Sequence, residues 1–289
     1  MRRLSLLLVA FASVALAQPP AKNAPPIEDP PADPKAAKIV LVAGSGYFKA
    51  GEHDYVAAAA VLADLLRQTP GVAPVVALDW PQKPDTFANA KAVVFFFDGA
   101  EKHAAIKGDR LAQVRKLADA GVGIVQFHQA VDYPKDFGDR AGGWAGAAWE
   151  KGVGERAHWV EEFKTFPDHA ICRGVTPFQI DDGWLWKLTF ADGAAGVTPL
   201  LRTWNAKAKD KPKDLQDVVA WAYEKGPSKS FSFTGGHLHA SFAQEGYRRF
   251  LTNGILWSAG VEVPKGGAKV ELDATTLGEY LTPAPAKKP

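Results

Sequence analysis

Continuous apolar runs that end at a glycine, an aspartate or a histidine alternate with helical patterns through the first half of this chain. The runs are KIVLVAG (38–44), APVVALD (73–79), AVVFFFDG (92–99) and VGIVQFH (122–128). A strand covered on both faces is continuously apolar, whereas a half-exposed strand alternates. Residues 55–68 and 109–120 carry apolar side chains at helical spacing. This order predicts an α/β fold, with a mostly parallel sheet flanked by helices.

The second half of the chain predicts shorter strands and a closing helix. The expected strands are 185–190, 198–204, 218–225 and 228–236, and the expected helix is 242–259. A Lys-Gly-Pro turn between two alternating runs, 218–225 and 228–236, predicts a hairpin. Asn253-Gly254 inside the helix predicts close packing against the sheet. Residues 132–182 are less regular, and a long insertion of this kind is often functional.

The two ends of the chain differ in composition from the rest. Residues 1–17 combine two arginines, an apolar run and an Ala-Leu-Ala site, which predicts a signal peptide cleaved after Ala17 and an exported, periplasmic or secreted protein. An uncleaved anchor helix is the alternative, but the apolar run is short for a membrane span. We expect a proline-rich disordered linker at 18–36, one domain at 37–264 and a tail at 265–289.

Charge and cysteine content exclude some classes of function. Cleavage after Ala17 removes two of the 34 basic residues, and the remaining 32 equal the 32 acidic residues in number. The net charge of the mature chain is therefore near zero, and no nucleic-acid partner is expected. The single cysteine, Cys172, excludes an internal disulfide. Gly44-Ser45-Gly46 follows a strand, but without a third glycine it is a weak dinucleotide signal, and a plain turn explains it equally.

Histidines gather where strands are expected to end. His53 lies in the loop after the first strand, His128 directly follows Phe127, and His237 and His239 follow the 228–236 strand. Ligands in an open parallel sheet bind beyond the carboxyl ends of the strands. If the last strand runs parallel to the others, these histidines share one edge and are candidate acid/base groups or metal ligands. The alternative for His128 is a polar residue that only closes a strand.

Acidic and aromatic residues accompany these histidines. A carboxylate can orient an imidazole, act as a general base or complete a metal shell. Asp132 and Asp182 are therefore candidate catalytic residues with His128 and His53, although a simple turn also explains Asp181-Asp182. The remaining candidate acids are Glu52, Asp54 and Asp98. Tryptophans such as Trp184 either stack on sugar rings or fill the core.

Several segments resemble the ThuA-like, trehalose-utilisation family. They are AGVGIVQFHQAVD (120–132), HAICRGV (169–175), DDGWLW (181–186), VVAWAYEKGPSKSFSFTGGH (218–237) and YRRFLTNGILWSAGVEVP (247–264). The family's proline is Ala170 here, its glutamate is Asp182, and its G-x-G-R segment reads Gly-Pro-Ser-Lys. The resemblance spans about 38–264 and implies a flavodoxin-like sandwich, similar to class I glutamine amidotransferases.

The resemblance implies the fold of the amidotransferases without their chemistry. Those enzymes carry a cysteine nucleophile at the turn that here holds His128, so we expect no Cys-dependent glutaminase activity. The family is linked to disaccharide or keto-sugar catabolism. We therefore expect an exported carbohydrate enzyme that acts on a small sugar. His53 and His128 would act as acid/base groups or hold a divalent metal, with His237 completing the set and His239 as a further candidate ligand. The alternatives are a non-catalytic sugar-binding protein and a metal-binding periplasmic protein.

Overall fold

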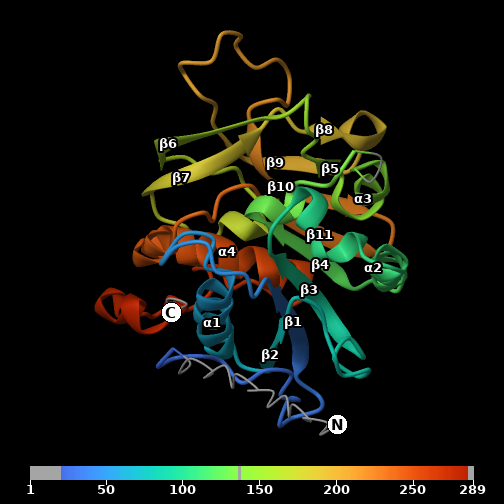
Figure 1. Ribbon diagram of the computed structural model, residues 1–289, viewed down its shortest axis with the longest axis vertical. Coiled ribbons are helices and arrows are strands. Elements are labelled where there is room, and N and C mark those ends of the chain that lie inside the picture. The colour runs from blue at the N-terminus through green and yellow to red at the C-terminus, as the bar shows by residue number, and fades with distance from the viewer. Residues whose placement is uncertain (1–20, 136–137, 286–289) are drawn as a thin grey trace, which may run out of the picture.

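A seven-stranded sheet forms the centre of the protein in a computed structural model that describes residues 21–135 and 138–285 (Figure 1). The strand order is β2-β1-β3-β4-β11-β10-β9. Its strands are β1 (Ala37–Ala43), β2 (Val72–Leu78), β3 (Ala90–Phe96), β4 (Gly123–Phe127), β9 (Val197–Arg202), β10 (Val218–Lys225) and β11 (Ser228–Phe233).

The first five strands in this order run parallel to one another. Counted along the chain, they follow the flavodoxin-like order 2-1-3-4-5, with β11 as the fifth strand. The expected hairpin is present, because β10 pairs antiparallel with β11. β9 then pairs antiparallel with β10 and forms the edge. The expected fold class, an α/β sandwich with a mostly parallel sheet, is confirmed.

Helices cover both faces of the sheet, which is why the strands are continuously apolar. Ile39 and Leu41 belong to the core on the side of α1 and α4, whereas Val40 and Val42 belong to the core on the side of α2 and α3. Gly254 lies against the sheet as expected, since an added Cβ would meet the Phe231 ring at 2.0 Å. The helices are α1 (Tyr55–Arg67), α2 (Arg110–Asp119), α3 (Gly138–Ala145) and α4 (Glu245–Ser258).

The irregular middle of the chain contains strands that the sequence pattern does not reveal. β6 (Glu155–Phe163) and β7 (Phe178–Trp186) form an antiparallel pair, separate from the central sheet in Figure 1. A smaller pair joins β5 (Ala147–Ala148) to β8 (Thr189–Phe190). The strand expected at 185–190 is thus divided between β7 and β8. Lys187, with a φ of 55°, lies between them and breaks the extended backbone.

Both flanking segments contact the domain where the structure describes them. The Glu28 carboxylate accepts hydrogen bonds from the backbone N–H groups of Gln82 and Lys83. On the other side, the Ala268 N–H donates to Asn253 on α4. The predicted signal peptide, residues 1–17, lies outside the described residues. Within the described ranges, each helix is too short or too polar to cross a bilayer. The expected domain boundaries stay a prediction.

Candidate functional site

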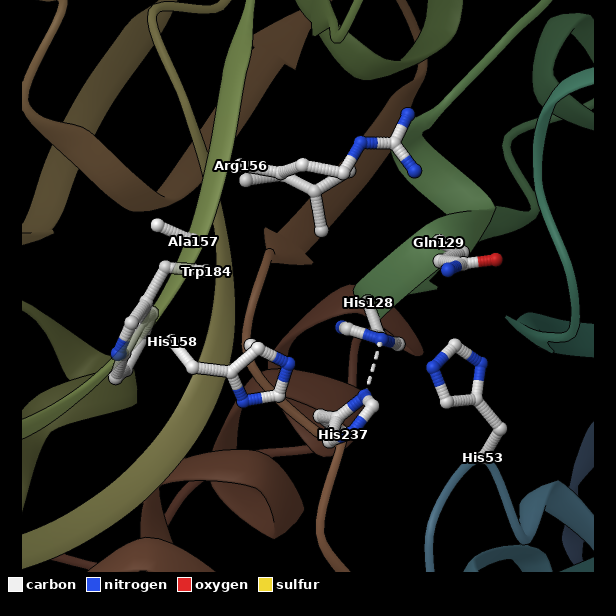
Figure 2. Close-up of a pocket in the computed structure, with 10 residues that line it drawn as sticks. His53, His128, Gln129, Arg156, Ala157, His158, Trp184 and His237 are labelled. Atoms are coloured by element: carbon white, nitrogen blue, oxygen red, sulfur yellow. Dashed lines mark hydrogen bonds between the residues drawn. The ribbon is translucent and has the colours of Figure 1, made fainter. Parts of the chain in front are cut away.

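Three histidines from distant segments converge beyond the carboxyl ends of the parallel strands. His53 precedes α1, His128 directly follows β4, and His237 follows β11. The ring centroid of His53 lies 4.9 Å from that of His128 and 4.4 Å from that of His237. The centroids of His128 and His237 are 5.3 Å apart. These histidines are expected to share one edge if the last strand runs parallel to the others, and β11 does run parallel to β4. Figure 2 shows the three rings facing one another.

The backbone at this cluster adopts conformations that side chains normally avoid. His53 has a φ of 50° and His128 a φ of 51°. A residue with a Cβ pays about 1–3 kcal/mol for this left-handed region, and such residues concentrate at functional sites. The His53 N–H also donates to the His237 carbonyl at 3.1 Å, which ties two of the three segments together. The fold therefore holds these rings in place at a conformational cost.

Hydrogen bonds fix which ring nitrogen of His128 and of His53 is free. His128 Nδ1 lies 3.0 Å from the Thr234 carbonyl, which can only accept, so Nδ1 carries the proton. The Tyr55 hydroxyl donates to Asp98 at 2.9 Å, so its oxygen accepts from His53 Nδ1 at 2.7 Å. In both rings Nε2 is therefore left with a lone pair.

His237 completes the arrangement in the opposite orientation. Its Nδ1 lies 3.4 Å from His128 Nε2, and its Nε2 lies 3.9 Å from the Glu52 carboxylate. The first contact also fits a long hydrogen bond when His237 Nδ1 carries the proton. In all three rings, one nitrogen faces the cluster and the other faces an oxygen acceptor. Metal-bound histidines have this pattern of outer partners.

The donor set fits a divalent metal ion. One ligand atom from each of the three histidines lies within 4.8 Å of the others. Two nitrogens bound to a tetrahedral zinc ion at 2.0–2.1 Å are about 3.4 Å apart, which matches the His128–His237 distance. Burial lowers the pKa of His128, and burial also lowers the pKa of His237 to about 4. Both rings are therefore neutral at pH 7, which a nitrogen ligand requires.

The two candidate aspartates have different surroundings. Asp182 is fully buried and accepts hydrogen bonds from the N–H groups of Gly183, Gly236 and His237 at 2.7–2.9 Å. Burial raises its pKa to about 6 against the opposing effect of these donors. It holds the backbone that carries His237. Asp132 instead pairs with Arg156 at 3.1 Å, and burial raises its pKa to about 6.

The other candidate acids also take distinct places. The Asp98 carboxylate lies 3.6 Å from His53 Nδ1 and accepts from the Tyr55 hydroxyl at 2.9 Å, and these two neighbours hold its pKa below the usual value. Asp54 caps α1 by accepting from the Ala57 N–H and also binds Thr282. Asp181 is exposed on β7.

His239 lies outside the cluster although it is two residues from His237. A short 3-10 helix, η6 (His239–Ala243), begins at this residue, so the extended backbone that would place both rings on one side is lost. Its Nε2 instead lies 3.2 Å from the Leu277 carbonyl, next to the C-terminal segment. Cys172 lies in another short helix, packed near α4, where burial raises its pKa to about 12.

A small cavity of about 150 Å³ opens beside the three histidines. Sequence patterns do not single out Arg156, Gln129, Gly183 or His158 as site residues. The ring centroid of His158 lies 4.5 Å from that of His237, and a Cβ at Gly183 would touch both rings. The available signal was the alternation of residues 155–163, which places His158 and Arg156 on one face of β6. The cavity is lined by His53, His128, Gln129, Arg156, Ala157, His158, Gly183, Trp184, Leu185 and His237.

Solved structures similar to this chain share its fold. A putative ThuA-like protein of Parabacteroides merdae aligns with a TM-score of 0.57 and 12% identity, covering 85% of this chain and 99% of its own. A second such protein, from Bacteroides uniformis, gives 0.55 and 12% identity, covering 78% and 93%. A cytoplasmic protein of Salmonella typhimurium gives 0.53 and 13% identity, covering 76% and 99%.

Sequence comparison identifies the family to which the chain belongs. No curated protein is similar enough to this chain to be matched. A family model named ThuA and described as trehalose utilisation matches residues 40–258, which include all three histidines of the cluster. That match covers most of the chain, and the protein belongs to the ThuA family.

Proposed function

We propose that this protein is an exported carbohydrate enzyme that binds a divalent metal through His53, His128 and His237. One observation carries the metal site. Three rings from three separate segments turn one nitrogen toward a common point and the other toward an oxygen acceptor. A set of core histidines that only satisfy backbone groups has no reason to align in this way.

The residues around the cluster fit a small sugar as ligand. When bound, a divalent metal would polarise a sugar hydroxyl or carbonyl oxygen. Arg156 and Gln129 offer hydrogen-bond donors on the same cavity, and His158 offers a group that can accept or release a proton. Asp132 positions Arg156, and Asp182 positions His237. The family description, trehalose utilisation, supports carbohydrate as the substrate class.

Metal content and turnover of the purified protein test this function. We expect about one divalent ion per chain in the wild type by elemental analysis, and conversion of disaccharides or their 3-keto forms. His128→Ala should lower metal affinity at least about 100-fold, because it removes a ligand rather than an outer partner, and should abolish turnover. His103→Ala is the matched control, since His103 is equally buried but lies outside the cluster.

Two results would contradict this function. Turnover that survives His128→Ala would exclude a catalytic role for the cluster. Sugar binding without turnover of any disaccharide or keto-disaccharide would instead identify a binding protein.

Export has its own test. We expect the protein recovered from the periplasm or medium to begin at Gln18, as N-terminal sequencing would show. A chain that keeps residues 1–17 and stays with the membrane fraction would indicate an anchor instead.

A further inference from the structure

The C-terminal strap, residues 268–282, runs from α4 across the end of α1. On α4, the Arg248 guanidinium donates to the Val270 carbonyl at 3.0 Å. At the end of α1, the Gln68 side chain exchanges two hydrogen bonds with the backbone of Glu271, at 2.7 and 2.8 Å. Figure 1 shows this last part of the chain, in red, beside α1. The strap is therefore fastened to two helices before it reaches the histidine cluster.

The far end of the strap binds the residue next to His53. Thr282 donates to both carboxylate oxygens of Asp54, through its N–H at 2.8 Å and through its hydroxyl at 2.6 Å. Asp54 directly follows His53 and also accepts from the Ala57 N–H in the first turn of α1. The backbone of His53 has a φ of 50°, and such a conformation persists only where its surroundings enforce it. The bonds to Asp54 supply part of that enforcement.

The middle of the strap binds the loop of His237. His239 Nε2 donates to the Leu277 carbonyl at 3.2 Å, because a carbonyl oxygen can only accept. The His239 N–H donates in turn to the Gly51 carbonyl at 2.9 Å, and the His53 N–H donates to the His237 carbonyl at 3.1 Å. The two histidine loops are thus hydrogen-bonded to each other, and the strap is hydrogen-bonded to both.

The strap accounts for two residues that the proposed metal site leaves unused. Asp54 and His239 are candidates from the sequence pattern, but neither belongs to the group of three histidines or lines the cavity beside it. Each is adjacent to a clustered histidine or two residues from one. A segment that only completed the core could end at any surface, whereas this strap ends on both of these loops. Its contacts therefore act on the site through the backbone.

We propose that Thr282, Asp54 and His239 are positioning residues of the histidine cluster. Through them, the C-terminal strap holds the two loops at the separation that a bound divalent metal requires. The effect on metal binding rests on the proposed function. The fixing of the two loops rests on the hydrogen bonds alone.

Thr282→Val in the full chain tests the strap at the loop of His53. The variant removes the hydroxyl donor and keeps the N–H and the side-chain volume. We expect affinity for Zn²⁺ to fall about fivefold in a chelator competition assay, less than the 10–100-fold typical for a direct outer partner of a metal ligand. The visible absorption bands of the Co²⁺-loaded protein, which report the coordination geometry, should shift. Thr282→Ser keeps the hydroxyl and should behave as the wild type.

His239→Phe tests the strap at the loop of His237. The variant keeps a ring of similar size but leaves the Leu277 carbonyl without its donor. Affinity for Zn²⁺ should again fall about fivefold. The double variant with Thr282→Val should bind Zn²⁺ more weakly than either single variant.

Gln68→Ala is the matched control, because it removes two hydrogen bonds from the same strap at a point away from both loops. It should lower stability in urea and leave the Zn²⁺ affinity and the Co²⁺ spectrum at their wild-type values. Equal losses of affinity in Gln68→Ala and Thr282→Val would reduce the strap to a general stabilising role and overturn the proposal. Wild-type affinity in Thr282→Val would overturn it as well.

Hydrogen exchange in the metal-free protein separates this proposal from the proposed function. The N–H groups of His53 and His239 bond across the two loops, and they should exchange about fivefold faster in Thr282→Val. If the wild type binds no metal but this exchange accelerates, the metal assignment fails and the positioning role stands. If the wild type binds Zn²⁺ and neither exchange nor affinity responds to Thr282→Val, the positioning role fails alone.

Discussion

His128 and His103 are both buried histidines, and both make a hydrogen bond to a backbone carbonyl. They differ in what the second ring nitrogen does. His103 Nδ1 accepts from the Ala105 N–H, so both of its nitrogens are used within the fold. His128 Nε2 faces His237 across the cluster. Burial of a histidine therefore does not mark a site, whereas a ring nitrogen that the fold leaves free for another group does.

The largest effect expected from this comparison is on stability at His103. His103→Ala leaves the Ala130 carbonyl and the Ala105 N–H without their partner and opens a cavity. We expect the free energy of unfolding to fall by about 3 kcal/mol, measured by urea unfolding. Metal affinity should stay at the wild-type value. If His103→Ala is as stable as the wild type but loses the metal, His103 belongs to the metal site and the contrast with His128 is wrong.

The pH dependence of stability sharpens the same contrast. Burial lowers the pKa of His103 from 6.5 to about 4. As pH falls from 6.5 toward 4, the unfolded chain takes up a proton at His103 and the folded chain does not, so the folded state loses stability. This loss reaches about 3 kcal/mol. The stability difference between wild type and His103→Ala should therefore shrink from pH 7 to pH 4, and a constant difference would disprove the assignment.

A smaller effect is expected at the outer partner of His53. Tyr55→Phe removes the hydroxyl that accepts from His53 Nδ1 and donates to Asp98. We expect metal affinity to fall about tenfold in a chelator competition assay. Tyr133→Phe is the matched control, because Tyr133 is also buried and hydrogen-bonded but stands beside His103. Equal losses in the two variants would mean that general loosening, and not ring orientation, is responsible.

The smallest effect is expected at His158. This exposed side chain contacts His237 but does not belong to the group of three whose ligand atoms converge. His158→Gln should change metal affinity less than about threefold, because the variant removes neither a ligand nor an outer partner. Turnover should fall if His158 moves a proton. A fall in metal affinity of more than about tenfold would instead indicate that His158 is a fourth metal ligand.

Part of the site follows directly from strand order, and part does not. The position of His128 at the end of a strand, and that of His53 in the loop after another, follow from apolar runs that stop at a known residue. The approach of His237 depends on β11 running parallel to β4, a pairing between segments about 100 residues apart. The separation of His239 from His237 depends on a helical turn that begins at His239. Local patterns carry no information about either event.

The cavity walls were harder to predict than the cluster. Arg156 and His158 belong to β6, a strand exposed on one face, whose weak alternation lies in a stretch that reads as irregular. The partner of Asp132 is Arg156, 24 residues away, rather than a histidine.

The sequence alone determined the α/β class, the strand ends and loops that carry His53, His128 and His237, and the presence of a histidine at the turn after β4. These features follow from hydrophobic periodicity and residue identity, which are local. The tertiary structure decided which ring nitrogens are free, which histidines meet and which side chains line the cavity beside them. Those outcomes depend on hydrogen bonds and packing between distant segments, whose geometry is set only when the whole sheet and its covering layers assemble.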